Sequence, residues 1–457
     1  MRRWIGAFVA VVLACIPILL ARSASPSLLA DTDTSVLLGA IRDRHAPLSW
    51  FITDWPLKNH FYRPVSTLAF EIDNLLYRNH AAGYGLTNAL LCVACVLMLF
   101  WFLRELTDSP AISGSAAALF ALQHTGLQNY AMAPIYYLAI VTAVIGVIRH
   151  GVSIRHWAPA CLVLLFSMSE LAGMDSLSAG SIGSGTIGWL PGRTATVMTM
   201  FALAAMALYA RYERSSGQMF IKPPCALDMP ATKSKAFSND APRAAIALPF
   251  LSLGCVALAF GAYEQAVMLP AIMLAIAVTM HFRGYRVRWG WQAGFWLILV
   301  GYLLLRKAVI PPGASGYQLQ QFRKGPGVAI SLFNYGLPFV NSIKGFLSDI
   351  ESGFIIFVTP APYSFFLSVS ANLTTFYQAR RRWILALAGY GMSIIAFLPM
   401  AWVKQFAHYN YWPMALRTLL TVTILWIGLD LIVIAWSPRS RQAPPRLDPA
   451  PGSLPHR

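Results

Sequence analysis

The acidic side chains of this sequence are few and unevenly placed, and their positions suggest chemistry before they suggest a fold. The chain has 18 Asp and Glu residues, and six of them fall between residues 22 and 83: Asp31, Asp33, Asp43, Asp54, Glu71 and Asp73. Asp31 and Asp33 follow an apolar run over residues 4–21. A carboxylate there, beside a cavity at membrane level, can act as a general base on a hydroxyl group or hold a metal ion with its phosphate. The structural alternative is a helix cap, in which Asp33 or Thr34 accepts from exposed backbone N–H groups.

Two further charged residues lie beside apolar segments, where burying an ionisable group is energetically unfavourable. Glu264 lies in the apolar sequence AYEQAVML, and an ionisable residue at membrane depth is a functional-site hypothesis by default. Its structural alternative is an ion pair, for which Arg193 is the expected partner. Arg63 precedes Pro64 at a predicted helix start. Its guanidinium can bind a phosphate through two parallel hydrogen bonds, or it can extend to the lipid headgroups.

Weaker candidates lie near the outer ends of later apolar runs. Arg306 and Lys307 can flank an anionic group or reach into the headgroup region. His408, in the sequence HYNYWP, stands among aromatic residues of the kind that ordinarily form the interfacial belt. Glu170 is isolated in LLFSMSELAG, and no motif supports a role for it.

Most of the remaining polar residues of the first outer segment are interpreted as structural. Asp73, Tyr77 and Asn88 are expected to tie this segment to the following helix through hydrogen bonds. Asp54 follows an aromatic run and is a lesser candidate for the catalytic carboxylate, with a cap of the interfacial helix as the alternative. Asp73, Tyr77 and Asn88 would frame a site without taking part in its chemistry.

Membrane helices are the elements that must position these residues. The chain of 457 residues is 57% hydrophobic and 12% charged, about half the charged share of a soluble domain. Its apolar runs are near the length of about 20 residues that spans a bilayer. Its net charge of +17 comes from basic residues between those runs, which is the positive-inside pattern of cytoplasmic loops. The sequence therefore predicts an all-α integral membrane protein and requires no nucleic-acid partner.

The charge pattern also predicts the topology, with about 12 spans and the amino terminus inside. The first apolar run is interpreted as a retained helix and not as a cleaved signal peptide. The predicted spans are 4–21, 84–103, 110–124, 131–148, 157–173, 194–210, 244–262, 266–281, 289–305, 353–373, 383–402 and 412–436. Residues 22–83 form a large first outer loop with interfacial helices, and residues 306–350 form a second.

Three segments outside these spans have predictions of their own. Residues 328–347 are expected to be a re-entrant or surface helix, since a full span would place the arginines at 380–382 outside. The sequence GMDSLSAGSIGSGTIG reads as a flexible outer loop. Residues 1–436 thus make one polytopic domain, and 437–457 a disordered cytoplasmic tail.

The stretch YRPVSTLAFEIDNLLYRNHAAGYGLTNALL, residues 62–91, resembles a signature of bacterial polytopic glycosyltransferases of the GT-C class. The subgroup concerned is often joined to tetratricopeptide repeats and includes protein O-mannosyltransferase-like enzymes; this chain has no such repeats. The positions that match are Tyr62, Arg63, Pro64, Leu68, Phe70, Asp73, Leu76, Gly83, Tyr84, Leu86 and Asn88. Gly85 and Cys92 replace two histidines of the pattern, and Arg78 replaces a glycine.

Three further segments resemble the same family and occur in the expected order. Residues 187–212 resemble its W-I-S-G-R segment and the helix after it. Residues 257–274 resemble its L-S-K-E helix and keep Glu264 and Pro270, although the lysine is missing. Residues 408–416 resemble R-Y-L-Y-L-P, with His408 in place of the arginine.

The resemblance implies an enzyme of the bacterial inner membrane whose active site faces the periplasm beneath the first outer loop. Members transfer a sugar from a polyprenyl-phosphate carrier to a glycan, lipid or protein acceptor, and the first loop supplies an acidic catalytic residue. Asp31 and Asp33 are the candidates here. Arg63, Glu264, Arg193, Arg306 and His408 are the expected substrate-binding residues. A divalent metal ion and charge stabilisation by basic side chains are both open as ways to stabilise the leaving phosphate.

Two other functions are compatible with the same sequence. A transporter or flippase for a lipid-linked precursor would also need many helices and the intramembrane residues Glu170 and Glu264. The sequence has no internal repeat symmetry of the kind that many transporters have, and a long polar first loop has no obvious use in one. The third possibility is an inactive accessory subunit, since several signature positions are substituted.

Overall fold

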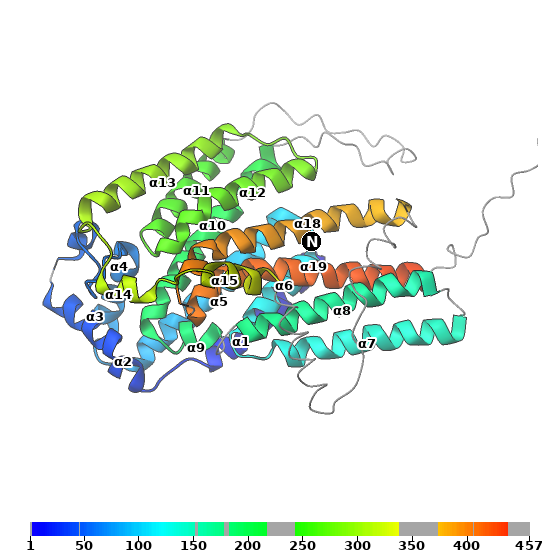
Figure 1. Cartoon of the computed structure of the whole chain (residues 1–457), viewed down its shortest axis with the longest axis horizontal. Helices are drawn as coiled ribbons and strands as arrows, with labels where there is room; N and C mark the ends of the chain where they lie inside the picture. The colour runs from blue at the N-terminus through cyan, green and yellow to red at the C-terminus, as the bar shows by residue number, and fades with distance from the viewer. Residues whose placement is uncertain are drawn as a thin grey trace, which may run out of the picture.

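The computed structural model describes residues 2–44, 46–150, 154–177, 182–216, 243–337, 373–404 and 406–436. Its elements in these ranges are all helices, apart from an isolated β-bridge between Phe322 and Val403. The long helices run side by side, and the short helices α2, α3, α4 and α14 gather at one end of them (Figure 1). We call this end the outer end, following the predicted orientation.

The long helices of the described ranges coincide with all but one of the predicted spans. They are α1 (Arg2–Leu20), α5 (Ala81–Thr107), α6 (Pro110–Gln123), α7 (Gln128–His150), α8 (Ile154–Leu177), α10 (Arg193–Ser216), α11 (Arg243–Phe260), α12 (Leu269–Phe282), α13 (Gly290–Val309), α18 (Leu373–Phe397) and α19 (Tyr411–Trp436). Within the described residues, seven helices are long and apolar enough to cross a membrane. The span predicted over 353–373 (apart from Leu373) and the tail over 437–457 lie outside the described residues.

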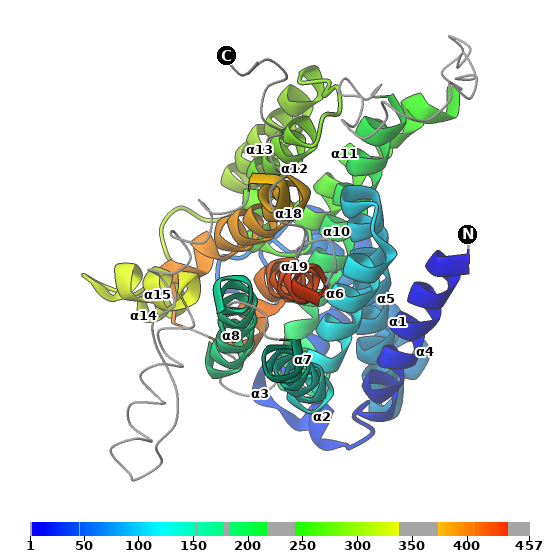
Figure 2. The same ribbon diagram turned by 90° about the vertical axis from the view of Figure 1, so that its right-hand side faces the viewer.

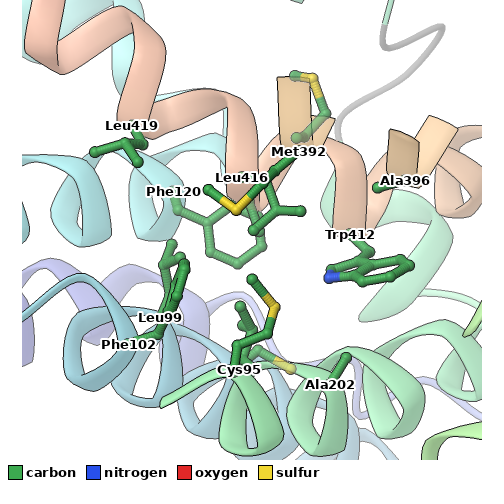
Figure 3. Close-up of a cluster of buried hydrophobic side chains, with 14 of the residues drawn as sticks. Cys95, Leu99, Phe102, Phe120, Ala202, Met392, Ala396, Trp412, Leu416 and Leu419 are labelled. Atoms are coloured by element: carbon green, nitrogen blue, oxygen red, sulfur yellow. The ribbon is translucent and has the colours of Figure 1, made fainter. Parts of the chain in front are cut away.

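Helix α19 occupies the middle of the bundle. It lies between α18, α8, α6 and α10 (Figure 2), and it contacts each of them. Its apolar side chains Trp412, Leu416 and Leu419 meet residues of α5, α6, α10 and α18, including Phe102 and Phe120 (Figure 3). A helix that is apolar all round belongs in such a position.

Helices α1 and α13, by contrast, keep large apolar side chains on the surface. Leu13 is 58% exposed, Leu297 69% and Leu304 64%. Contiguous exposed apolar faces of this kind are rare on soluble monomers and mark a membrane-facing surface. These exposures therefore agree with the predicted multi-pass membrane protein.

A buried ion pair fastens the carboxyl-terminal end of α15 (Gly327–Gly336) to the bundle. Glu170 of α8 and Arg417 of α19 are each 1% exposed and lie 2.6 Å apart. Arg417 also donates to the backbone oxygens of Tyr335 and Gly336 at the end of α15. The predicted re-entrant or surface helix over 328–347 is thus a helix up to Gly336, and residues 338–347 lie outside the described range.

The prediction of a flexible loop over residues 173–188 is wrong at both of its ends, since residues 173–177 belong to α8; residues 178–181 lie outside the described range. Residues Ile182–Thr186 form α9, and η2 (Leu190–Gly192) follows it. Gly183 packs so closely that a Cβ atom there would lie 1.9 Å from the backbone oxygen of His124. The glycines that suggested flexibility instead allow backbones to approach each other.

The first outer loop has an apolar core of its own. It contains α2 (Ser27–Ala30), α3 (Thr32–Asp43), η1 (Pro47–Ile52) and α4 (Pro64–Tyr77). Buried side chains from these elements form one cluster, which contains Leu28, Leu37, Leu38, Ile41, Trp50, Trp55, Phe70, Ala81, Tyr84 and Leu190. The loop is therefore a folded platform on the outer ends of α5 and α10.

The Glu170–Arg417 pair predicts a large effect of breaking it on one side only. Arg417→Met should lower the free energy of unfolding by about 3–5 kcal/mol, because it leaves an uncompensated buried carboxylate. The double variant Glu170→Leu/Arg417→Met should recover most of that loss. Denaturant unfolding of the detergent-purified protein, followed by tryptophan fluorescence, measures both.

A matched control is available in a more exposed ion pair that α19 makes with α18. Arg382 and Asp430 form an ion pair in which both side chains are partly exposed, 31% and 46%. Arg382→Met should cost about 0–1 kcal/mol. Equal losses for Arg417→Met and Arg382→Met would contradict the proposed role of the buried pair.

Candidate functional site

An ion pair between Arg63 and Glu264 joins the first outer loop to the turn between α11 and α12. The Nη2 and Nε atoms of Arg63 lie 2.7 and 2.8 Å from Oε2 of Glu264. The backbone N–H of Tyr62 donates to the other carboxylate oxygen at 3.2 Å. Arg63 is 8% exposed and Glu264 22%. The carboxylate predicted at membrane depth thus has a partner, but it is Arg63 and not the expected Arg193.

The start of α4 explains why this pair forms. Arg63 stands at the N-cap position and Pro64 opens the helix, which is a favourable place for a residue without an N–H group. The next amide, of Val65, donates to the backbone oxygen of Gly261 at 2.8 Å. A Cβ atom on Gly261 would lie 2.7 Å from a methyl group of Val65. The glycine therefore permits the close contact that brings Arg63 to Glu264.

Aromatic rings surround the Arg63 guanidinium. Its central carbon lies 4.4 Å from the ring centre of Trp55, 4.2 Å from Phe61 and 4.5 Å from Tyr263. Cations at such distances are attracted to ring faces. Burial lowers the pKa of Arg63, but the negative charge of Glu264 outweighs this and the pKa lies above its usual value. The site therefore holds a permanent, directed positive charge.

Asp31 and Asp33 have different surroundings although they are two residues apart. Asp31 caps α3, with Oδ2 accepting from the Thr34 amide at 3.3 Å and from the Trp189 indole N–H at 3.1 Å. The capping residue is thus Asp31, and the prediction of Asp33 or Thr34 in that role is wrong. No hydrogen bond or ion pair of the Asp33 carboxylate is found within the described part of the chain. Burial, and secondarily the charge of Asp31, raise the pKa of Asp33.

Aromatic side chains connect the two aspartates to the Arg63–Glu264 pair. The ring of Trp189 lies 5.0 Å from that of His408, and His408 lies 6.5 Å from Tyr263. Burial raises the pKa of Tyr317, the charge of Arg63 lowers it and that of Asp33 raises it, so Tyr317 is within electrostatic range of both. We call the following residues the outer polar cluster: Asp31, Asp33, Arg63, Trp189, Tyr263, Glu264, Tyr317, His408 and Tyr409.

The helix α14 (Gly316–Gln321) carries Tyr317, and the outer loops hold it from two sides. On one side, the side chains of Arg306 and Gln318 both donate to the backbone oxygen of His60 at 3.2 Å. On the other, the Lys404 amide donates to the backbone oxygen of Gln321 at 2.9 Å. Arg306 contacts His60, which precedes Arg63 by three residues. It therefore lies at the rim of the cluster.

Arg193 does not reach the outer polar cluster. It is fully buried, pairs with Asp73 at 2.6 Å, and donates to the side chain of Asn88 at 2.7 Å and the backbone of Tyr84 at 3.1 Å. Burial raises the pKa of Asp73, and the charge of Arg193 opposes this shift. The predicted brace holds for Asp73, which accepts from the Thr87 hydroxyl at 2.9 Å, and for Asn88, which shares Arg193 with it. Tyr77 contacts the following helix through its ring, 5.9 Å from that of Tyr84, and not through a hydrogen bond found among the described residues. Asp54 accepts from the amides of Trp55 and His60, as a local cap.

Trp189, Tyr263 and Tyr317 were not predicted as site residues. Trp189 lies within the segment IGWLPGR that carried the family resemblance, and Tyr263 directly precedes Glu264; both signals were present. Tyr317 had no such signal, because its place depends on how α14 is held.

Two further features bear on what the site can bind. Among the described residues, no group of three or more His, Cys, Asp or Glu side chains is placed to hold a metal ion. The positive charge beside the aspartates comes from Arg63 and Arg306. A cavity of about 640 Å³ lies on the opposite face of α3, where Ser35, Gly39 and Arg42 line it, and it does not include the cluster.

Comparison with known proteins finds no matching family model, no matching curated protein and no matching solved structure. A function for this chain is therefore inferred from the residue types in the outer polar cluster and from their geometry.

The raised pKa of Asp33 predicts a pH-dependent effect on stability. Its ordinary value is 3.8, and a folded-state pKa above that value means that stability is lost as pH rises through the folded pKa. Asp33→Asn should therefore raise the melting temperature at neutral pH by about 1–2 °C. The gain in melting temperature should vanish at about pH 3, where Asp33 is protonated in both the folded and the unfolded protein. Thermal unfolding at several pH values measures this.

The exposed residue Asp43 provides the control. Asp43→Asn removes the same charge from the far end of α3 and should leave the melting temperature nearly unchanged at both pH values. An equal gain for Asp33→Asn at low and neutral pH would show that the effect is unrelated to titration of Asp33.

Proposed function

We propose that this chain is an integral-membrane glycosyltransferase of the bacterial inner membrane. It moves a sugar from a polyprenyl-phosphate carrier to an acceptor hydroxyl at the periplasmic face. The observation that carries the proposal is the meeting of a carboxylate with raised pKa and a buried, ring-enclosed arginine in one cluster. These two groups match the two needs of glycosyl transfer, a base for the acceptor and a cation for the leaving phosphate.

Asp33 is the better candidate for the general base. A carboxylate whose pKa is raised is a stronger base than an ordinary one. The Asp33 carboxylate would take the proton of the acceptor hydroxyl while the hydroxyl oxygen attacks the anomeric carbon. The bond between that carbon and the phosphate oxygen breaks, and polyprenyl phosphate leaves with the bonding electrons. Asp31 is fixed by Thr34 and Trp189 and caps the start of α3. Its negative charge helps to raise the pKa of Asp33.

Arg63 is the proposed ligand of the carrier phosphate. Its guanidinium is already oriented by Glu264 and three rings, so little rearrangement is needed to stabilise developing charge. An arriving phosphate competes with the Glu264 carboxylate for the same N–H groups. Arg306 at the rim adds a second positive charge, and the flat face of the partly exposed Trp189 suits the apolar face of a sugar ring.

The transporter alternative gains no support from the buried acidic residues. Glu170, one of the two on which it relied, is bound to Arg417 and holds α15 in place. Glu264 faces Arg63 in the outer polar cluster, outside the middle of the helices. Both carboxylates therefore have positions and partners that an outward-facing enzyme site accounts for.

Removal of both aspartates tests the proposed base. Asp31→Asn/Asp33→Asn should leave the protein inserted and folded but lower transfer by about 100-fold or more, the usual contribution of a general base. The assay follows radiolabelled polyprenyl-phosphate sugar in proteoliposomes and asks whether label reaches an acceptor. Asp43→Asn is the control with unchanged transfer. Full transfer by the double variant would refute the assignment, and label that only crosses the bilayer would favour a flippase.

A binding measurement tests the role of Arg63 separately. Arg63→Gln should weaken binding of sugar-free polyprenyl phosphate by about tenfold or more, since hydrogen bonds to charged groups contribute about 1.5–3 kcal/mol. Glu264→Gln keeps a hydrogen-bond acceptor but removes the competing charge, so it should bind at least as tightly as wild type. Thermophoresis in detergent gives both dissociation constants. Weaker binding by Glu264→Gln than by Arg63→Gln would contradict the competition between carboxylate and phosphate.

A further inference from the structure

A second polar cavity lies at the end of the helices opposite the outer polar cluster. It has a volume of about 370 Å³ and lies between the ends of α1, α5 and α10. Its lining residues are Trp4, Arg104, Glu105, Asp108, Arg211, Arg214 and Ser215. Under the orientation that the basic loops predict, this end faces the cytoplasm.

The charges in this inner cavity do not cancel. Arg214 binds both carboxylates, with Asp108 at 2.6 Å and Glu105 at 3.7 Å. Arg104 lies over the ring of Trp4, at 5.3 Å from its centre. Neither Arg104 nor Arg211 has a carboxylate partner within the part of the chain that the structure describes. The lining thus has three guanidinium groups and two carboxylates, which leaves one positive charge without a counter-charge.

The surroundings of the cavity indicate a lipid and not a soluble anion. The first residue after Trp4 is Ile5, which is 57% exposed, and Phe8 and Val9 on the same helix are 47% and 48% exposed. This apolar surface is where acyl chains would lie. Basic pockets between the cytoplasmic ends of membrane helices bind anionic headgroups.

We infer that the inner cavity binds the phosphate of an anionic phospholipid from the inner leaflet. Arg104 and Arg211 contact the phosphate, Trp4 packs beside the headgroup, and the acyl chains follow the exposed side of α1. The bound lipid neutralises the remaining positive charge of the cavity and links α1 to α10 through α5. This site is separate from the proposed catalytic site and does not depend on the glycosyltransferase assignment.

Native mass spectrometry of the full-length protein tests this inference. The protein is delipidated in uncharged detergent and offered phosphatidylglycerol or phosphatidylcholine at equal concentration. Each basic side chain near an anionic headgroup contributes about a fivefold preference, so wild type should prefer phosphatidylglycerol by roughly 25-fold. Arg104→Gln/Arg211→Gln should abolish this preference. Lys58→Gln/Lys324→Gln removes two exposed charges from the outer loops and should keep it.

Three results would overturn the inference. They are equal binding of the two lipids by wild type, an unchanged preference in the arginine double variant, and displacement of the lipid by inorganic phosphate alone, which would identify a soluble anion as the ligand. A second measurement on wild type covers the case in which the double variant does not fold. Phosphatidylglycerol with a photoreactive group near its headgroup should label peptides containing Trp4, Arg104 or Arg211; label confined to the outer loops would contradict the site.

Discussion

A charged side chain inside an apolar helix bundle needs a partner, because the interior stabilises an isolated charge poorly. Three buried arginines of this chain meet that constraint in the same way. Arg63 binds Glu264, Arg193 binds Asp73, and Arg417 binds Glu170. Each pair joins segments that are far apart in the sequence. The arrangement of the outer ends of the helices therefore depends on these three contacts.

The three pairs have different consequences for the candidate site. The Arg417 pair holds α15. The Arg193 pair holds the junction of α4, α5 and α10, and Trp189 precedes Arg193 by four residues. Both pairs are almost completely closed to water. The Arg63 pair is different, because Glu264 is 22% exposed and an incoming anion can compete for the guanidinium. Pairs of the same chemistry thus serve as structural contacts or as a binding site according to their access to solvent.

The outer polar cluster also concentrates features that oppose stability. Asp33 is partly buried beside another carboxylate, and Arg63 is desolvated. Costs of this kind are usual where a site must be ready for a charged ligand. The folded first loop offsets them with its own apolar core around Trp50, Trp55 and Phe70. At the opposite end of the bundle Arg104 and Arg211 are exposed and carry no such cost, so they remain open to the proposed lipid phosphate.

The sequence by itself determined the helices and most of the residues of interest. Apolar runs and the basic residues between them placed most of the long helices to within a few residues, since these signals are local; α18 begins ten residues before the predicted 383. Asp31, Asp33, Arg63, Glu264 and His408 could be singled out because charged or polar residues are rare beside membrane spans. Asp73 and Asn88 could be assigned to a brace for the same reason.

Only the tertiary structure decided which of these residues meet. Arg63 and Arg193 are chemically alike, and the local sequence does not distinguish the partner of Glu264 from that of Asp73. The choice depends on the close contact of Val65 with Gly261, some two hundred residues apart. The glycines before Trp189 looked flexible for a related reason, because the backbone that packs against Gly183 is that of His124. Pairings between distant segments are set by packing and burial, and neither is visible in local residue types.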